Sequence, residues 1–499
     1  MKIGRSAGLL LPIFSLPGPH GIGTLGREAF AWIDFLAEAK QTFWQVLPVG
    51  PTGYGNSPYQ SFSSFAGNPY FIDPDLLAED GLLTPSEYRD TFRDVPPGRV
   101  DYGALFLQKE PLLRKAVFRL YESPPPELGR FFAAESSWLE DYALFSALKR
   151  EKHGAPFWEW SAGEREGDPL ALEGAGIRLS DEIRYEKGVQ YLFFSQWEKL
   201  KRYAAKRGVR LFGDLPFYVS ADSADVFFHR SEFFLDAKGA PTRIAGCPPD
   251  AFAVSGQLWG NPIYRFDVMK ENGYRFWISR LAFSLGMFDL LRIDHFRGFD
   301  AFYTVAAGAK DAHDGTWQQG PGEDFFRCIQ KALGDLPLVA EDLGFVTESV
   351  KNLLRAADIP GMKVLQFAFD SREAGDYLPY RYPLQSVVYT GTHDNDTLHG
   401  FIRHAAPKDI ANAMRYLWAK SEEELCRNMM LAALASPSDL SILTVQDLLG
   451  LGSEARINTP GTSDGNWEFR LRRLPGEKEA KFLAEYTELY GRCESAGGS

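Results

Sequence analysis

One arrangement recurs along the chain and limits its fold: an amphipathic helix is followed by a short apolar strand that ends in a polar residue. The segment before VRLFGDLP, for example, places Val189, Phe193, Trp197 and Leu200 at helical spacing. This alternation gives eight candidate strands, at residues 43–49, 69–73, 209–216, 289–294, 336–342, 362–370, 386–394 and 441–447. Apolar strands that alternate with helices favour a parallel sheet whose outer face is covered.

Eight such units predict an α/β protein built on a (β/α)8 TIM barrel with inserted, mainly helical subdomains. A doubly wound parallel sheet is the structural alternative, because it shows the same alternation. We expect residues 1–499 to form a single catalytic barrel that is interrupted twice. An inserted subdomain at 75–208 would separate the second and third strands, and an insertion at 216–288, between the third and fourth, would include an active-site loop at 245–264.

Composition narrows the possible partners and the compartment. The net charge of −12 argues against nucleic acid and anionic membranes, since both attract basic surfaces. Four cysteines lie far apart without CxxC spacing, which favours free thiols in a reducing compartment over disulfides or a zinc site. Pro12 and Pro17 interrupt the apolar N-terminal run, so we reject a signal peptide. We expect a cytoplasmic protein that is a monomer or a weak homo-oligomer.

Polar residues collect where the predicted strands end. They are Asp73, Asp214, Arg292, Asp294, Glu341, Asp342, Asp370, His393, Asp394, Asp396 and Asp447. A single acid at a strand end is usually a helix cap or a loop hydrogen bond, and we expect this of Asp73 and Asp447. Several acids on one rim cost free energy through repulsion, and function is the usual reason to tolerate that cost.

Two reaction classes use such a rim. Glycoside chemistry needs an ionised carboxylate and a protonated carboxylic acid, whereas metal-dependent chemistry needs His and Asp ligands. In LLRIDHFRGF, Arg292 and Asp294 share one face of a strand, so the arginine would hold the aspartate ionised and would repel a metal. Glu341, near two anions, would have a raised pKa and could serve as the acid.

Two histidines near these acids have different interpretations. His393, in GTHDNDT, either belongs to a capped loop or offers a neutral imidazole to a substrate hydroxyl, with Asp394 accepting from neighbouring hydroxyls. His295 alternates to the outer face of its strand, so we expect it to be structural.

The motifs LLRIDHFRGF, VAEDLG, YTGTHDNDT and GDLPFYV resemble the four barrel motifs of the α-amylase clan. More specifically, AGLLLPIFSLPGPHGIGTLG, WQVLPVGPTGYGNSPYQSFSSFAGNPYFID and RINTPGTSDGNWEFR resemble the 4-α-glucanotransferases. These are the amylomaltases or disproportionating enzymes of glycoside hydrolase family 77. The resemblance runs from residue 7 to about residue 472.

The resemblance implies a role for particular positions. Asp294 corresponds to the nucleophile that forms a covalent glucosyl-enzyme, Glu341 to the general acid/base, and Asp394 to the carboxylate that stabilises the transition state. Residues implied in sugar binding are Arg292, His393, Asp214 and Tyr59 at the cleavage point, Ser57, Asn466 and Trp259 on the acceptor side, and Tyr54, Phe367 and Asp370 along the groove.

The implied activity is transfer of α-1,4-glucan segments between maltooligosaccharide, starch or glycogen chains by a retaining double displacement, with ring closure as a variant. The family needs no metal and no cofactor. A covering loop with Trp259 would favour transfer by excluding water and holding the acceptor. The alternatives are an α-1,4-glucan hydrolase with the same carboxylates, a non-catalytic glucan-binding protein, and a metal-dependent barrel enzyme.

Overall fold

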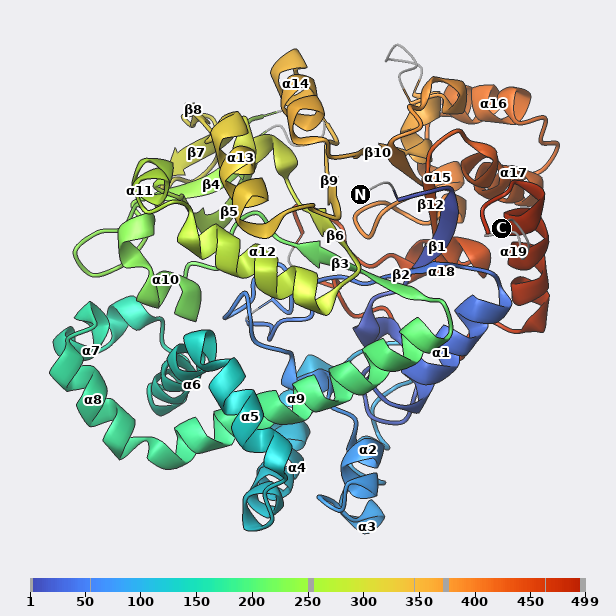
Figure 1. Cartoon of the computed structure of the whole chain (residues 1–499). Coiled ribbons are helices and arrows are strands. Elements are labelled where there is room, and N and C mark those ends of the chain that lie inside the picture. Colours follow the sequence, from blue (N-terminus) through green and yellow to red (C-terminus); the bar gives the residue numbers. More distant parts are fainter. Residues whose placement is uncertain are drawn as a thin grey trace.

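The computed structural model describes residues 3–53, 55–249, 255–344, 346–370, 377–462 and 464–493. Its centre is an eight-stranded parallel sheet, ordered β10-β11-β12-β1-β2-β3-β6-β9 (Figure 1). The strands are β1 (Ser6–Leu10), β2 (Phe43–Gln45), β3 (Arg210–Leu215), β6 (Leu290–Ile293), β9 (Leu338–Ala340), β10 (Gly361–Val364), β11 (Ser386–Tyr389) and β12 (Leu440–Thr444).

The two end strands of this sheet meet and make it a barrel. The backbone N–H of Ala340, in β9, donates to the carbonyl of Pro360 just before β10 at 2.8 Å. The amide of Met362 donates to Asp342 Oδ1 at 2.6 Å across the same junction. The predicted TIM barrel is therefore confirmed, and the doubly wound sheet is wrong.

The first strand of the barrel differs from the prediction. Residues 6–10 form β1, whereas the predicted strand at 69–73 is a 3-10 turn, η2 (Pro69–Phe71), followed by a helix. Asn68 caps this turn through the amide of Tyr70, and prolines begin both the turn and the following helix, so local turn chemistry overrides the apolar run. Gly8 is required in β1, because a Cβ there would lie 2.5 Å from the carbonyl oxygen of Phe43.

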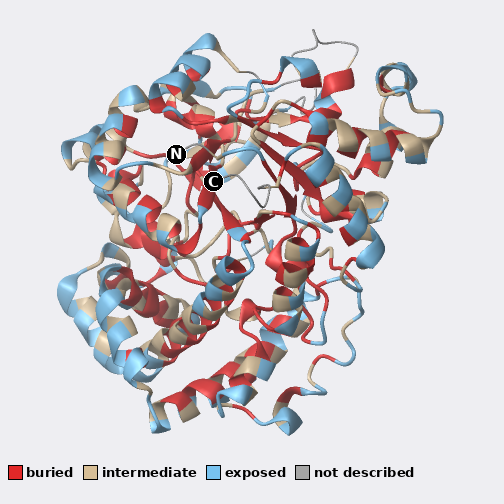
Figure 2. Ribbon diagram, turned by 45° about the vertical axis from the view of Figure 1, so that its right-hand side comes forward, coloured by how far each residue is buried: buried red, intermediate tan, exposed pale blue. Residues whose placement is uncertain are grey.

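Helices cover the outside of the barrel, and their buried faces point toward the strands (Figure 2). The covering helices are α1 (Arg27–Glu38), α9 (Ser180–Lys206), α12 (Arg275–Met287), α13 (Gly322–Leu333), α14 (Glu348–Ala357), α15 (Leu398–His404), α16 (Pro407–Tyr416), α17 (Glu422–Ala435) and α19 (Glu477–Leu489), with the short α18 (Val445–Leu448) directly after β12. None of the helices described is both long and apolar enough to cross a bilayer.

Two groups of elements stand beside the barrel. Between β2 and β3 the chain forms α2 (Pro74–Glu79), α3 (Pro85–Tyr88), α4 (Tyr102–Glu122), α5 (Pro126–Ala134), α6 (Ser136–Glu151), α7 (Ala162–Glu166) and α8 (Pro169–Arg178). Of these, α4, α5, α6 and α8 pack against the long α9. The second group is an antiparallel sheet, ordered β5-β4-β7-β8, with α10 (Ala224–Phe228) and α11 (Phe266–Glu271) close by in the chain. Its strands are β4 (Arg243–Cys247), β5 (Gln257–Pro262), β7 (Ala301–Ala306) and β8 (Thr316–Gln319).

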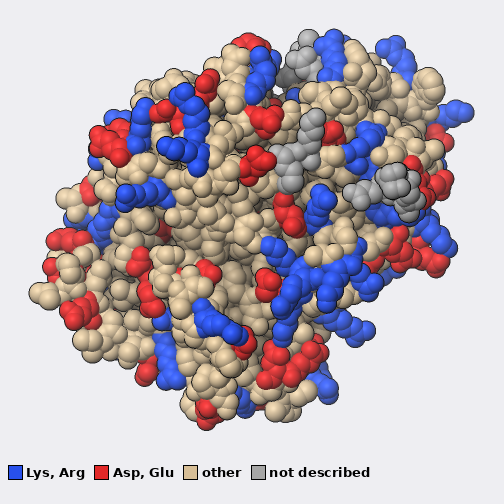
Figure 3. All heavy atoms as spheres, viewed as in Figure 1, with Lys and Arg blue, Asp and Glu red and all other residues tan. Residues whose placement is uncertain are grey.

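The second sheet adds strands to insertions that are otherwise mainly helical. It joins strands from two different connections of the barrel, β3 to β6 and β6 to β9, so no single stretch of sequence contains it. On the surface, acidic and basic side chains are interspersed over the face in Figure 3, with much uncharged surface between them.

Candidate active site

The carboxyl ends of the barrel strands bring the central polar residues together. Arg292 in β6 and Asp214 in β3 are register partners, so their side chains point to the same inner face. Arg292 Nη1 lies 2.7 Å from Asp214 Oδ2, and Arg292 Nη2 lies 2.9 Å from Asp294 Oδ1. The guanidinium is thus a bridge between two aspartates, of which Asp214 is fully buried and Asp294 is 31% exposed.

This bridge has a clear electrostatic consequence. Burial disfavours the Arg292 cation, but Asp214 and Asp294 outweigh burial and hold its pKa well above the usual range. Burial raises the pKa of Asp214, and Arg292 opposes that rise. Asp294 is the more accessible of the two aspartates, and it lies beside a permanently charged guanidinium.

Glu341 follows β9 and is held differently. Its Oε2 accepts from the backbone N–H of His295 at 2.8 Å, and its Oε1 accepts from the backbone N–H of Leu343 at 2.8 Å. Burial raises the pKa of Glu341 to about 7, with Asp294 and Asp342 adding to the rise and Arg292 opposing it. The predicted rise is confirmed, although burial rather than the neighbouring anions is its largest cause.

His295 leaves the strand in a left-handed conformation, with φ of 45°, directly after Asp294. Its ring lies among aromatic side chains: the ring centroid of Trp259 is 4.9 Å away in an edge contact, and that of Tyr218 is 6.0 Å away in a stacked one. Burial lowers the pKa of His295 to about 4, so the ring is neutral near pH 7. The left-handed turn also aims its N–H at Glu341 and thereby links the two candidate catalytic carboxylates.

The segments after β11 and before α19 supply a second group of residues to the rim. Asp394 is 42% exposed, lies 3.4 Å from His393 Nε2, and accepts from Asn458 Nδ2 at 2.6 Å. The rings of Tyr59 and His393 stack at 5.2 Å, and Trp467 lies within 6 Å of both. Asn458 and Trp467 were not predicted, although they lie in the RINTPGTSDGNWEFR motif.

Tyr59 contacts both Asp214 and His393, and so links the two groups of rim residues. Its hydroxyl donates to Asp214 Oδ2 at 2.8 Å, and its backbone N–H donates to Ser57 Oγ at 3.3 Å. The loop that carries Tyr59 is anchored further along, where the N–H and the hydroxyl of Ser64 both donate to buried Asp225 Oδ2 at 2.8 and 2.9 Å. Sequence reasoning missed Asp225 because it lies in a short helix far from any strand end.

The remaining predicted positions are described by their own local contacts. Trp259, in β5, is half-buried, and its backbone carbonyl accepts from the side-chain amide of Gln60. Gln60 lies three residues after Ser57 in the chain. The side-chain oxygen of Asn466 accepts from the backbone N–H of Thr459, and Asn466 directly precedes Trp467 in the chain. Phe367 lies in η6 (Leu365–Phe369) with its ring 5.5 Å from that of Tyr377, and Asp370 ends that turn. Tyr54 lies outside the described residues, as does part of the predicted loop 245–264.

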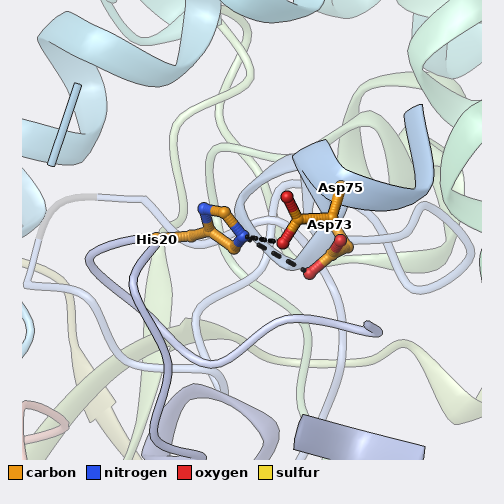
Figure 4. A group of neighbouring side chains, drawn as sticks. All are labelled: His20, Asp73 and Asp75. Carbon is orange, nitrogen blue, oxygen red and sulfur yellow. Dashed lines mark hydrogen bonds and ion pairs between the residues drawn. The ribbon is translucent and has the colours of Figure 1, made fainter. Parts of the chain in front are cut away.

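Two of the acids have the structural roles expected of them. Asp73 caps α2 through the amide of Leu76, and Asp447 accepts from the hydroxyl of Thr390 and from the amide of Leu398. Among the described residues, the cluster with metal-like spacing is His20, Asp73 and Asp75 (Figure 4). Its polar atoms already have protein partners: His20 Nε2 lies 2.9 Å from Asp75 Oδ2, and the hydroxyl of Tyr88 donates to Asp75 Oδ1 at 2.6 Å. We interpret it as a junction between the segment before α1 and the start of α2.

Comparison with known proteins agrees with this geometry. The family model described as 4-alpha-glucanotransferase matches residues 11–475. A 4-alpha-glucanotransferase from Thermus thermophilus is 48% identical, over 98% of this chain and 100% of the relative. A chloroplastic/amyloplastic 4-alpha-glucanotransferase from Solanum tuberosum is 39% identical, over 98% of this chain and 86% of the relative.

Solved structures of amylomaltases are similar to this chain in fold. An amylomaltase from Streptococcus agalactiae, in complex with acarbose, superposes with a TM-score of 0.96 at 39% identity, over 98% of this chain and 100% of that one. An amylomaltase from Corynebacterium glutamicum shares the fold, with a TM-score of 0.77 at 18% identity over 98% of this chain and 74% of that one. By sequence and by structure, the chain belongs to the 4-alpha-glucanotransferase family, glycoside hydrolase family 77.

Proposed function

We propose that the rim transfers α-1,4-glucan segments between chains of maltooligosaccharide, starch or glycogen type by a retaining double displacement. The observation that carries this proposal is the contrast between two neighbouring carboxylates. Asp294 is accessible and paired with Arg292 at 2.9 Å, while burial raises the pKa of Glu341 to about 7. A retaining enzyme needs this division, with one carboxylate charged and one protonated at neutral pH.

In the first step, an Asp294 oxygen forms a bond to the anomeric carbon while the bond from that carbon to the glycosidic oxygen breaks. Glu341 gives its proton to the departing oxygen, which leaves as the free 4-hydroxyl of the released chain. The remaining negative charge on Glu341 is received by the backbone N–H groups of His295 and Leu343. Asp394, fixed by Asn458 at 2.6 Å, would accept from sugar hydroxyls as positive charge develops on the ring.

In the second step, Glu341 takes a proton from the 4-hydroxyl of an acceptor glucan, and that oxygen displaces Asp294 from the anomeric carbon. Transfer competes with hydrolysis because water could attack the same carbon. We infer that Trp259 holds the acceptor sugar, and its ring contact at 4.9 Å with His295, the residue directly after Asp294 in the chain, supports this role. An acceptor held there reacts faster than free water, because its hydroxyl is already oriented.

Purified protein incubated with maltotriose alone tests the proposal. We expect free glucose and oligosaccharides longer than maltotriose, with a constant number of reducing ends, since each transfer breaks one glycosidic bond and forms another. A rise in reducing ends without longer products would identify a hydrolase instead. Absence of both changes would contradict any catalytic role for the rim.

A further inference from the structure

The turn between α16 and α17 displays an exceptionally exposed tryptophan. Trp418 is 88% exposed, whereas large apolar side chains elsewhere in this part of the chain mostly pack inward. Its backbone φ is 55°, in the left-handed region. The amide of Ala419 donates to the carbonyl of Met414 at 2.9 Å, so Trp418 occupies the position that follows a helix C-cap in a Schellman turn.

That position favours glycine or asparagine, because a Cβ is strained at positive φ. A bulky aromatic residue there costs free energy through the backbone, and the exposed ring gains no free energy of burial to offset that cost. Strained and exposed residues of this kind concentrate at functional sites. Trp418 therefore calls for an explanation other than packing.

Trp418 forms one wall of an open surface groove at the side of the barrel where α16, α17 and α19 lie together (Figure 1). Two further aromatic residues, Tyr416 and Tyr490, line the same groove, and Leu431 and Ala432 of α17 contribute to its lining.

Asn428 supplies a polar group within this groove. Its Nδ2 donates to the carbonyl of Leu417 at 2.9 Å, which fixes the turn that presents Trp418. Within the described part of the chain, no residue donates to its amide oxygen. Aromatic faces with a few amide and hydroxyl groups are the usual composition of a site for a ligand that is flat, apolar on its faces and polar at its edges.

The lining also limits the occupant. It contains no Asp, Glu, Lys or Arg although the chain carries a net charge of −12, so it suits a neutral ligand. Its eight residues are far fewer than the roughly 20–30 per partner in a stable protein interface, which argues against a second copy of this chain. The groove lies beside the turn η6 that follows β10, because the ring of Tyr416 lies 5.7 Å from that of Phe369 in η6.

We propose that the groove of Tyr416, Trp418 and Tyr490 is a second binding site for α-1,4-glucan, which holds a remote part of a long chain while the rim acts on its end. This inference rests on the proposed function of the rim. It predicts a difference between substrates: a polymer reaches both sites at once and gains from the added contact, whereas maltotriose is bound by the rim alone.

The test compares two variants of Trp418 with the wild type. Trp418→Gly removes the ring and suits the positive φ, so folding is not at risk, and Trp418→Tyr keeps an aromatic face. Phe118→Ala serves as the control, because Phe118 is 67% exposed on α4 and lies outside the groove. The readouts are kcat and KM with amylose and with maltotriose, retardation in native gels that contain glycogen, and the sedimentation coefficient without glucan.

We expect Trp418→Gly to raise the KM for amylose about three- to tenfold and to reduce retardation by glycogen. Its kinetics with maltotriose should be unchanged, Trp418→Tyr should restore most of the loss, and Phe118→Ala should behave as the wild type. Equal amylose KM and equal retardation in Trp418→Gly would overturn the proposal. So would a smaller sedimentation coefficient with unchanged glucan affinity, which would make the groove a contact between copies. Failure of the wild type to disproportionate maltotriose would instead contradict the proposed function, since gel retardation reports binding without turnover.

Discussion

The rim at the strand ends, with Arg292 among Asp214, Asp294 and Glu341, and the helical layer of α4, α6 and α9 both contain arginines among carboxylates. The two clusters differ in how the charges are paired. In the helical layer, Arg114 and Arg150 face Glu110, Glu182 and Glu186, and each carboxylate has a guanidinium nitrogen within 3.3 Å. Burial would raise the pKa of Glu110, but Arg150 and Arg114 together lower it. Glu110 is thus held as an anion by its side-chain partners, whereas burial raises the pKa of Glu186 and Arg150 opposes that rise.

At the rim, one guanidinium serves Asp214 and Asp294, and Glu341 receives backbone N–H groups instead of an ion pair from any described residue. Its pKa is therefore free to rise to about 7 through burial. The comparison teaches that side-chain cations hold Glu110 as an anion in the helical layer, whereas Glu341, which has backbone N–H partners and no ion pair among the described residues, is available for acid–base chemistry.

The largest expected effect comes from removing the carboxylate of Asp294. Asp294→Asn keeps the size of the side chain but removes the nucleophilic oxygen, so kcat with maltotriose should fall on the order of 10⁴-fold or more. Glucan binding, followed by retardation in glycogen gels, should persist. A variant that still turns over at a tenth of the wild-type rate would contradict the role proposed for Asp294.

Glu341→Gln should have the next largest effect, because the departing oxygen loses its proton donor. We expect kcat on maltotriose to fall by about 10²- to 10⁴-fold. A maltosyl fluoride donor needs no proton for its leaving group, so release of fluoride should fall far less. Equal losses with both donors would show that Glu341 does not act as the acid.

The pKa of Glu341 also predicts a pH dependence. In the wild type, kcat with maltotriose should decline as pH rises through about 7, where Glu341 loses its proton. Because the folded pKa is raised above the ordinary value of 4.5, this group contributes stability that is complete below pH 4.5 and is lost as pH rises through about 7. Unfolding of wild type and Glu341→Gln in urea at pH 5 and pH 8 would measure that difference, which should favour the variant at pH 8.

In the helical layer, the expected effect is on stability and not on catalysis. Arg150→Met leaves Glu186, whose side chain is 6% exposed, without its cationic partner at 2.8 Å. The free energy of unfolding should fall by about 2 kcal/mol, with kcat on maltotriose unchanged. Lys481→Met is the matched control, because its pair with Glu477 is fully at the surface and should contribute little. A loss of kcat in Arg150→Met at temperatures where it is folded would remove the distinction between the two clusters.

The smallest expected effect concerns the choice between transfer and hydrolysis. Trp259→Ala should raise the share of hydrolysis a few-fold, because an acceptor held less firmly competes less well with water. The ratio of new reducing ends to free glucose from maltotriose measures this share. An unchanged ratio would remove the acceptor role from Trp259.

Several features could be predicted from residues alone because they depend on local patterns. Helical spacing in α9 and the apolar strands from β3 to β12 indicated the barrel, and the Arg292–Asp294 pair indicated a charged rim. Other features depended on turn chemistry that an apolar pattern hides. Proline and Asn68 turned the apolar run at 69–73 into a 3-10 turn, and the strand at 6–10 was not recognised.

Physical reasons also explain the site residues that were missed. Asn458 and Trp467 contact Asp394, Tyr59 and His393 only after the chain has passed around the barrel, so no short spacing in the sequence links them. Asp225 acts through Ser64, more than 150 residues earlier, and the second sheet joins strands from two separate connections.

The sequence by itself determined the alternation of helices and strands, the polar residues at the strand ends and the membership of a family, because each of these is written in contiguous residues. Only the tertiary structure decided which carboxylate is paired with a side-chain cation and which is held by backbone N–H groups. It also decided that Trp418, at a strained turn, borders a groove with Tyr416 and Tyr490. Burial and charge matching arise from residues far apart in the chain, and for that reason no linear pattern encodes them.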